Sequence, residues 1–311
     1  MPKNKKLTND FTWSFSRHRM FNSCKRKYYY QYYGSWGGWE ENADEVVRKL
    51  YLLKSMTTLP MLAGDVVHKM ISIVLESWKR GYEIPVDKAE AQIINNFRKS
   101  WRESKNGEWE RSPKWKTNLF EHYYEENPST DRLLEIKDTM VESIHGFYLS
   151  ESYDFIKTLS TREWLSKEKM DTFDFHGTKV WCVVDFAIRH AEKVYIYDWK
   201  TGKKTPEDEI QLSIYALYAQ EKWDVDLKDL RLIDVYLKHH LSPKIKPNRT
   251  IITRTEDMIN DGIFKMKELL DDEFENKASI DKFPMVDDNW VCSYCKYKEV
   301  CYSDSWKELS A

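Results

Sequence analysis

The polar residues best spaced to do chemistry lie in the segment VYIYDWKTGKK, residues 194–204. Its Val, Ile and Tyr residues predict a β-strand, in which successive side chains point to opposite faces. Asp198 and Lys200 should therefore share one face with Val194 and Ile196. A carboxylate and an ammonium group are costly on an apolar face unless they are paired or hold an ion. A salt bridge near a strand end is one explanation, and a site for chemistry is the other.

A second carboxylate, Asp185 in VVDFAIRH, lies one predicted hairpin upstream. The four-residue link 190–193 would pair the two strands antiparallel, so that Asp185, Asp198 and Lys200 converge at one end of a sheet. Mg²⁺ and Mn²⁺ prefer oxygen-rich sites of this kind. Such an ion can activate water and offset charge on a phosphoryl oxygen, while a lysine can orient or deprotonate the attacking water. The set therefore indicates metal-assisted attack of water on a phosphoryl group.

Composition narrows the class of protein. The 311 residues carry a formal net charge of −2, which excludes a globally basic nucleic-acid binder. No stretch approaches the ~18 apolar residues of a membrane span, and the N-terminus lacks an apolar signal region, so we expect a cytoplasmic protein without membrane contact. Five cysteines in a reducing compartment favour metal binding or chemistry over disulfides.

Charge is concentrated near the N-terminus. Residues 1–30 carry eight basic side chains and one acid, Asp10, which predicts contact with phosphate; an ordinary N-terminus of a soluble protein is the alternative. The basic residues are Lys3, Lys5, Lys6, Arg17, Arg19, Lys25, Arg26 and Lys27. We take Arg17, Arg19, Lys25 and Arg26 as weak candidates for DNA contacts.

Periodicity divides the chain into a helical first half and a mixed second half. We expect helices over residues 16–33, 45–59, 61–81, 87–103, 130–157, 205–223 and 255–275. Strands are expected between residues 160 and 202 and over residues 230–238. Thr205, Pro206 and Asp208 form an approximate helix-start signal just after the Asp-Trp-Lys strand.

The order acid, hairpin, Asp-x-Lys resembles the signature of the PD-(D/E)XK nucleases. DWKTGKK is close to the form found in RecB and AddB nuclease domains and in CRISPR-adaptation nucleases. In that branch a helix with Gly-x-x-x-His supplies a metal ligand, which matches His68 in GDVVHKMI. A Gln-x-x-x-Tyr pair on the helix after the strand helps position the DNA and the active site, which matches Gln211 and Tyr215. The alternatives are a histidine on a helix flank, a surface glutamine and a core tyrosine.

The cysteine spacing extends the resemblance. Cys292-x2-Cys295-x5-Cys301 closes the chain, and Cys24 stands alone near its start. Four thiolates suit an iron–sulfur cluster or zinc, and ligand number does not separate the two. RecB-like nucleases that contain a cluster hold [4Fe-4S] with this arrangement, so the resemblance favours iron, with Zn²⁺ as the alternative. The fifth cysteine, Cys182, is expected in the core, at a position where family members often have glycine.

The resemblance implies an α/β fold. We expect a restriction-endonuclease-like core, with a mixed β-sheet flanked by helices, a large helical N-terminal part, and a cysteine-held cluster joining the N- and C-terminal regions. The expected divisions are residues 1–34 with the first cluster cysteine and the basic segment, 35–158 with the His68 helix, 159–254 with the nuclease core, and 255–311 with the final helix and the cysteine-rich segment.

The implied activity is metal-dependent hydrolysis of DNA. Asp185, Asp198, His68 and the Trp199 backbone carbonyl would hold Mg²⁺ or Mn²⁺, with Lys200 beside the attacking water. Acting as an exonuclease on single strands or free ends, the protein would serve repair, recombination, defence or phage DNA metabolism. No nucleotide-binding loop is present, so a helicase or other partner would drive any unwinding. Two alternatives are a DNA-binding, nuclease-like subunit with little activity of its own and a zinc-stapled structural protein.

Overall fold

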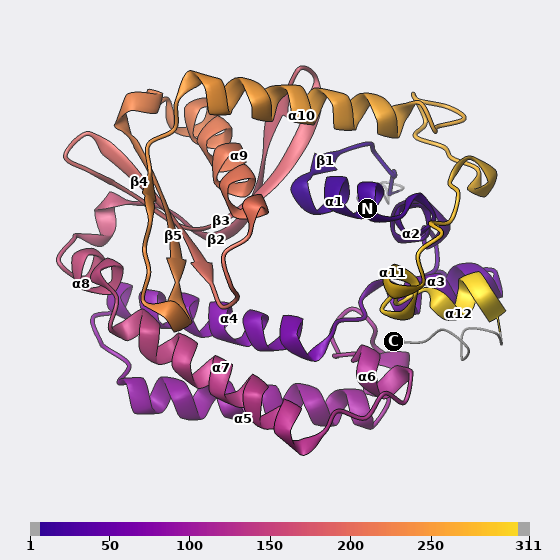
Figure 1. Ribbon diagram of the computed structural model, residues 1–311, viewed down its shortest axis with the longest axis horizontal. Helices are drawn as coiled ribbons and strands as arrows, with labels where there is room; N and C mark the ends of the chain where they lie inside the picture. Colours follow the sequence, from indigo (N-terminus) through magenta and orange to yellow (C-terminus); the bar gives the residue numbers. More distant parts are fainter. Residues whose placement is uncertain (1–6, 304–311) are drawn as a thin grey trace, which may run out of the picture. The chain divides into compact units, whose positions relative to one another are not determined.

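The computed structural model describes residues 7–303, coloured by sequence in Figure 1. The chain divides into two compact units. The core unit comprises residues 57–173 and 182–256, and the terminal unit comprises residues 1–56, 174–181 and 257–311. Lys3, Lys5 and Lys6 of the basic N-terminal segment lie outside the described residues.

The core unit contains a mixed β-sheet. Its strands are β2 (Trp164–Phe175), β3 (Thr178–His190), β4 (Lys193–Lys200), β5 (Leu230–Tyr236) and β6 (Lys244–Ile245), except that residues 174–181, at the end of β2 and the start of β3, belong to the terminal unit. They are ordered β3-β4-β5-β6, with β2 also paired to β3. The β3–β4 and β5–β6 pairs are antiparallel, and β4–β5 is parallel. A parallel pair needs a crossover, which α9 (Pro206–Trp223) provides.

Three long helices form a layer on one face of this sheet (Figure 1). They are α4 (Leu59–Lys79), α5 (Val86–Lys105) and α7 (Thr130–Tyr148). Two short helices, α6 (Phe120–Tyr123) and α8 (Glu151–Lys157), come before and after α7 in the sequence. The apolar stripe of α4 is buried as its period predicts: Val67, Ile71 and Val74 are fully inaccessible. The mixed sheet flanked by helices is therefore confirmed, and it is consistent with a restriction-endonuclease-like core.

Several expected helices differ from those observed. Residues expected as one helix over 16–33 form two α-helices and a π-helical turn, and the helix expected over 45–59 ends at Lys54. The single helix expected over residues 130–157 is two helices, because Ser150 accepts a hydrogen bond from the Tyr153 amide and caps α8. Helix α10 (Arg249–Lys267) was expected over residues 255–275; it begins six residues before the expected start and ends eight residues before the expected end.

The two faces of β4 have different neighbours. Trp199 faces the helical layer, where its ring meets that of Phe147 on α7 at a centroid distance of 5.3 Å. Asp198 and Lys200, one residue to either side, face α9 instead, as alternation along the strand predicts. In the parallel β4–β5 ladder Asp198 is in register with Asp234, so these two side chains share the face that α9 covers.

The terminal unit joins the first and last parts of the chain. It contains β1 (Trp13–Ser14), α1 (Phe15–Ser23), α2 (Lys25–Tyr29), a π-helical turn (Tyr30–Gly34), α3 (Glu45–Lys54), α11 (Asn289–Ser293), α12 (Lys298–Tyr302) and the last part of α10. Arg26 Nε donates to the Phe283 carbonyl at 2.7 Å, and a Cβ at Gly262 would lie 2.5 Å from His18 Nδ1. These contacts link segments far apart in sequence.

No helix among residues 7–303 is both long and apolar enough to cross a membrane.

Candidate active site

Asp198 and Lys200 form an ion pair on the face of β4 that α9 covers. Asp198 is 3% exposed, and the Lys200 ammonium also donates to Gln211 Oε1 at 2.9 Å. Burial and the nearby charge of Asp185 raise the pKa of Asp198 to about 7, against the opposing charge of Lys200. Burial would lower the pKa of Lys200, but the charge of Asp198 and their hydrogen bond raise it above the ordinary value. The pKa values of both members of this ion pair are therefore raised above their ordinary values.

Helix α9 holds one oxygen of Asp198 in place. The Tyr215 hydroxyl lies 3.2 Å and Gln211 Nε2 lies 3.3 Å from Asp198 Oδ1, and Gln211 Nε2 donates to the Tyr215 oxygen at 2.7 Å. The i,i+4 spacing of Gln211 and Tyr215 puts both on the helix side that faces β4. Thr205 and Asp208 form a capping box that starts α9 five residues after Lys200.

Asp185 and His68 complete the cluster. Asp185 Oδ2 accepts a hydrogen bond of 2.8 Å from the Trp199 amide and lies 3.4 Å from His68 Nδ1 on α4. Burial alone would lower the pKa of His68, but the charge of Asp185 and their hydrogen bond outweigh it and raise the pKa to about 9. The structure therefore brings together all six predicted residues: His68, Asp185, Asp198, Lys200, Gln211 and Tyr215.

Two further acids that the sequence reasoning did not assign to the site lie near Lys200. Asp208 Oδ1 is 3.5 Å from Lys200 Nζ, and Asp234 is 2% exposed with its Oδ1 lacking a hydrogen-bond partner among residues 7–303. Burial raises the pKa of Asp234 to about 6, with Lys200 opposing the rise. An acid in the apolar strand LRLIDVYLK was a usable signal for Asp234. Its register with Asp198 was not predictable without knowing that β4 and β5 are parallel neighbours.

The donor set fits a hard divalent cation. Most of the side chains that could bind an ion here are carboxylates, and there are more carboxylates than cationic groups in the cluster. Within residues 7–303, however, no group of three or more His, Cys, Asp or Glu side chains is already arranged to hold a metal ion. Lys200 pairs with Asp198, and His68 pairs with Asp185. Ion binding would therefore require these two pairs to open.

The four cysteines of the predicted cluster all belong to the terminal unit. Cys24 Sγ accepts from the Lys27 amide at 3.4 Å, and Cys295 Sγ accepts from the Tyr297 amide at 3.5 Å. Burial raises the pKa of Cys295, and Cys24 and Cys292 add a smaller rise through their charge. The Tyr302 hydroxyl donates to Cys292 Sγ at 3.3 Å.

The pKa of Cys301 is raised to about 12 by burial and, in part, by Cys295 and Cys24. The charges of Cys24 and Cys292 thus act on Cys295, and those of Cys295 and Cys24 act on Cys301, but no three of these cysteines are already arranged to hold a metal ion within residues 7–303. The amide donors would stabilise thiolates bound to a metal. Cys182 belongs instead to the core unit, where burial raises its pKa to about 12.

The four basic candidates for DNA contacts differ in exposure. Arg17 and Arg26 are half-buried and donate to backbone carbonyls of the terminal unit, at 2.8 Å for Arg17 and 2.7 Å for Arg26. Arg19 and Lys25 are exposed. Arg19 lies over the Phe15 ring at 6.0 Å and Lys25 over the Phe21 ring at 5.8 Å, so all four side chains have partners within the terminal unit.

Comparison with known families agrees with this site. The family model of the PD-(D/E)XK nuclease superfamily matches residues 12–302. The chain therefore belongs to the PD-(D/E)XK nuclease superfamily, whose members are usually metal-dependent nucleases. A comparison with curated proteins found no significant match.

Proposed function

We propose that this protein is a Mg²⁺- or Mn²⁺-dependent deoxyribonuclease of the RecB/AddB-like branch, acting as an exonuclease on single-stranded DNA or DNA ends. One observation carries the proposal: Asp185, Asp198 and Lys200 lie in a single, partly buried cluster with His68, Gln211 and Tyr215. A surface ion pair would leave Asp198 exposed and would need none of these partners. The resemblance to that branch supports the choice of substrate.

Asp185, Asp198, His68 and the Trp199 carbonyl would hold the divalent cation, which supplies Lewis-acid stabilisation of charge that develops on the phosphoryl oxygens. Tyr215 and Gln211 fix Asp198 Oδ1, so that Asp198 Oδ2, now paired with Lys200, is the oxygen available to the ion.

Lys200 orients the attacking water and takes or gives a proton at its amine. Gln211 Oε1 gives that amine a second partner, which keeps Lys200 near the reaction when it parts from Asp198. Gln211 is therefore a positioning residue for both the acid and the lysine.

We also propose that Cys24, Cys292, Cys295 and Cys301 hold a structural [4Fe-4S] cluster, with Zn²⁺ as the alternative occupant. The mutual influence of the thiols and the amide donors to sulfur support a shared metal site. The resemblance favours iron. By the same resemblance we propose a role in DNA repair, recombination, defence or phage DNA metabolism, with a separate helicase supplying any unwinding.

The test is digestion of end-labelled linear and circular DNA with Mn²⁺, beside calorimetric titration of Mn²⁺. Asp198→Ala should abolish both metal binding and cleavage. Lys200→Ala should bind Mn²⁺ but cleave roughly 10²-fold more slowly or worse, the scale of a positioned acid–base group. Lys193→Ala, at the opposite end of the same strand, should match the wild type.

Cleavage by Lys200→Ala at the wild-type rate would contradict the assigned roles. DNA binding without any cleavage in Mn²⁺ would instead favour a nuclease-like binding subunit. Cleavage of circular DNA would replace the exonuclease assignment with an endonuclease.

A further inference from the structure

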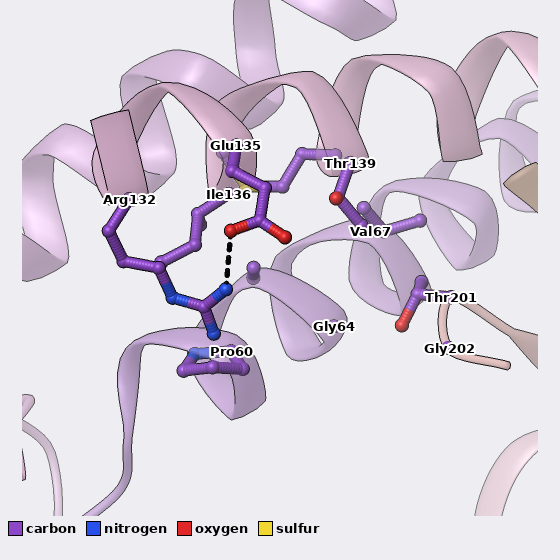
Figure 2. Close-up of a pocket in the computed structure, with 11 residues that line it drawn as sticks. Pro60, Gly64, Val67, Arg132, Glu135, Ile136, Thr139, Thr201 and Gly202 are labelled. Atoms are coloured by element: carbon purple, nitrogen blue, oxygen red, sulfur yellow. Dashed lines mark hydrogen bonds and ion pairs between the residues drawn. The ribbon is translucent and has the colours of Figure 1, made fainter. Parts of the chain in front are cut away.

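A cavity of about 250 Å³ lies inside the core unit, between α4, α7 and the loop that follows β4. Figure 2 shows Pro60 and Gly64 of α4, the Arg132–Glu135 pair of α7, and Thr201 of the loop around this space. None of its lining residues has a role in the proposed reaction.

The cavity shares its walls with the proposed active site. Thr201 and Gly202 follow Lys200 directly in the chain. Gly64 lies four residues before His68 on α4, so the two positions lie on the same side of that helix, one turn apart. The elements that carry Lys200 and His68 therefore also line this cavity.

The lining chemistry suits one nucleotide. Ala63, Val67, Ile136 and Met140 are buried and form an apolar floor. A small apolar site with few polar groups is typical of ligand pockets, and this volume falls just below the range of about 300–1,000 Å³ for drug-sized ligands.

Polar groups are confined to the walls and the mouth. The Thr139 and Thr201 hydroxyls are able to donate to or accept from the edge of a base. Arg132, with 48% of its side chain exposed, pairs with Glu135 at 2.6 Å. A guanidinium at this position is free to exchange an exposed carboxylate for a phosphate, for which its planar fork is well matched.

We propose that this cavity receives the unpaired nucleotide next to the scissile phosphate, with its base against the apolar floor and its phosphate on Arg132. The inference rests on the proposed nuclease function and deepens it. A base enters such a pocket only when it is released from a duplex, so the cavity selects single strands and frayed ends.

Gly64 lines the cavity beside the loop that follows β4. A Cβ at this position would lie 3.4 Å from Thr201 Oγ1, which is an ordinary contact, so the backbone there tolerates a small side chain. Larger side chains lining the cavity should fill it without touching Lys200 or Asp198. Thr139 is a suitable site because it is only partly buried and lies on α7.

The experiment measures affinity for short single strands in EDTA, where no cleavage occurs. The oligonucleotides are identical except for an abasic residue at the 5′ end, at the 3′ end or in the middle. For the wild type, removing one terminal base should weaken binding by about tenfold, the loss expected from one buried apolar group. In Thr139→Trp that sensitivity should disappear, while Leu134→Trp, an exposed control on the same helix, should retain it.

Arg132→Gln provides a second variant at an exposed position, where folding is not at risk. It should weaken intact and abasic strands alike and reduce the salt slope of binding by about one phosphate contact. Two results would contradict the cavity proposal while leaving Mn²⁺-dependent cleavage intact. One is a wild type that binds both end-abasic strands as tightly as the intact strand, and the other is a folded Thr139→Trp that still loses affinity when the terminal base is removed. If the wild type loses affinity when a terminal base is removed but cleaves no DNA, the proposed nuclease function is wrong and the proposed role of the cavity in binding a nucleotide stands.

Discussion

Lys200 and Asp198 meet Gln211 and Tyr215 because β4 and α9 each direct these side chains toward the other element. Strand alternation indicated that Asp198 and Lys200 share a face, and helical spacing put Gln211 and Tyr215 on one side of α9. The contribution of His68 came from a motif rather than from a rule of geometry. Asp234 was missed because its place beside Asp198 depends on a parallel pairing across a crossover, which no local pattern encodes.

Asp234 provides a test at this scale. Burial raises its pKa to about 6, so the folded state binds this proton more tightly than the unfolded chain does. Stability from this group is therefore present at low pH and is lost as the pH rises from about 4 through 6. Asp234→Asn should unfold in urea with a free energy roughly 1–3 kcal/mol higher than the wild type at pH 7, measured in EDTA.

The difference should shrink as the pH falls toward 4, where the wild-type carboxyl is also neutral. A less stable Asp234→Asn at pH 7 would mean instead that a partner holds this carboxylate charged.

Elements were predicted better than their ends. The longer helices and strands of the core unit were expected in the right order, but α6 and β6 were not expected, and α7 and α8 were expected as one helix. Besides the Ser150 cap, the last turn of α7 makes a close tertiary contact. A Cβ at Gly146 would lie 1.9 Å from the Leu237 carbonyl oxygen, so α7 passes directly against the chain that leaves β5. Contacts of this kind are long-range in sequence and leave no local signal for where a helix must turn.

The β3–β4 hairpin offers a test at the scale of an element. Its turn is a tight two-residue loop, with His190 paired to Lys193 and with Ala191 and Glu192 at φ of 47° and 63°. Both positions favour the Asn-Gly pair typical of type I′ turns. Replacing Ala191 with Asn and Glu192 with Gly should raise unfolding stability by about 1 kcal/mol, measured by urea denaturation.

Mn²⁺ affinity should stay the same in this variant, because the turn lies at the opposite end of β4 from Asp198. A lower urea midpoint would show that Ala191 and Glu192 gain more from their present contacts than they lose in backbone strain.

At the scale of the whole molecule, the terminal unit depends on segments from both ends of the chain. Cys24 and Cys292 are 268 positions apart (292 − 24), so a shared cluster would close a loop of nearly the whole chain. Such a closure restricts the unfolded ensemble, and the energy of binding the metal adds to the stability of the fold. The sequence indicated this pairing only through a resemblance, because spacing alone does not say which distant cysteine completes a set.

Protein purified without oxygen should be brown, with about four irons per chain. Cys24→Ala, Cys292→Ala, Cys295→Ala and Cys301→Ala should each lose the colour and lower the thermal midpoint. Cys182→Ala is the control and should stay brown, because this thiol belongs to the core unit. Colourless protein with one zinc would contradict the iron assignment but would still support a metal site shared by the four cysteines. Wild-type colour and stability in Cys24→Ala would contradict the shared metal site itself.

The make-up of the terminal unit also affects how the chain folds as the ribosome makes it. Residues 7–56 are complete long before their partners from residue 257 onward emerge, a gap of 201 positions (257 − 56). At about 5–20 residues per second, this gap lasts roughly 10–40 s. During that time Trp13, Phe21 and Tyr28, which are all buried in the finished protein, lack the later half of their surroundings. These side chains are therefore fully surrounded only after residues from 257 onward have been made.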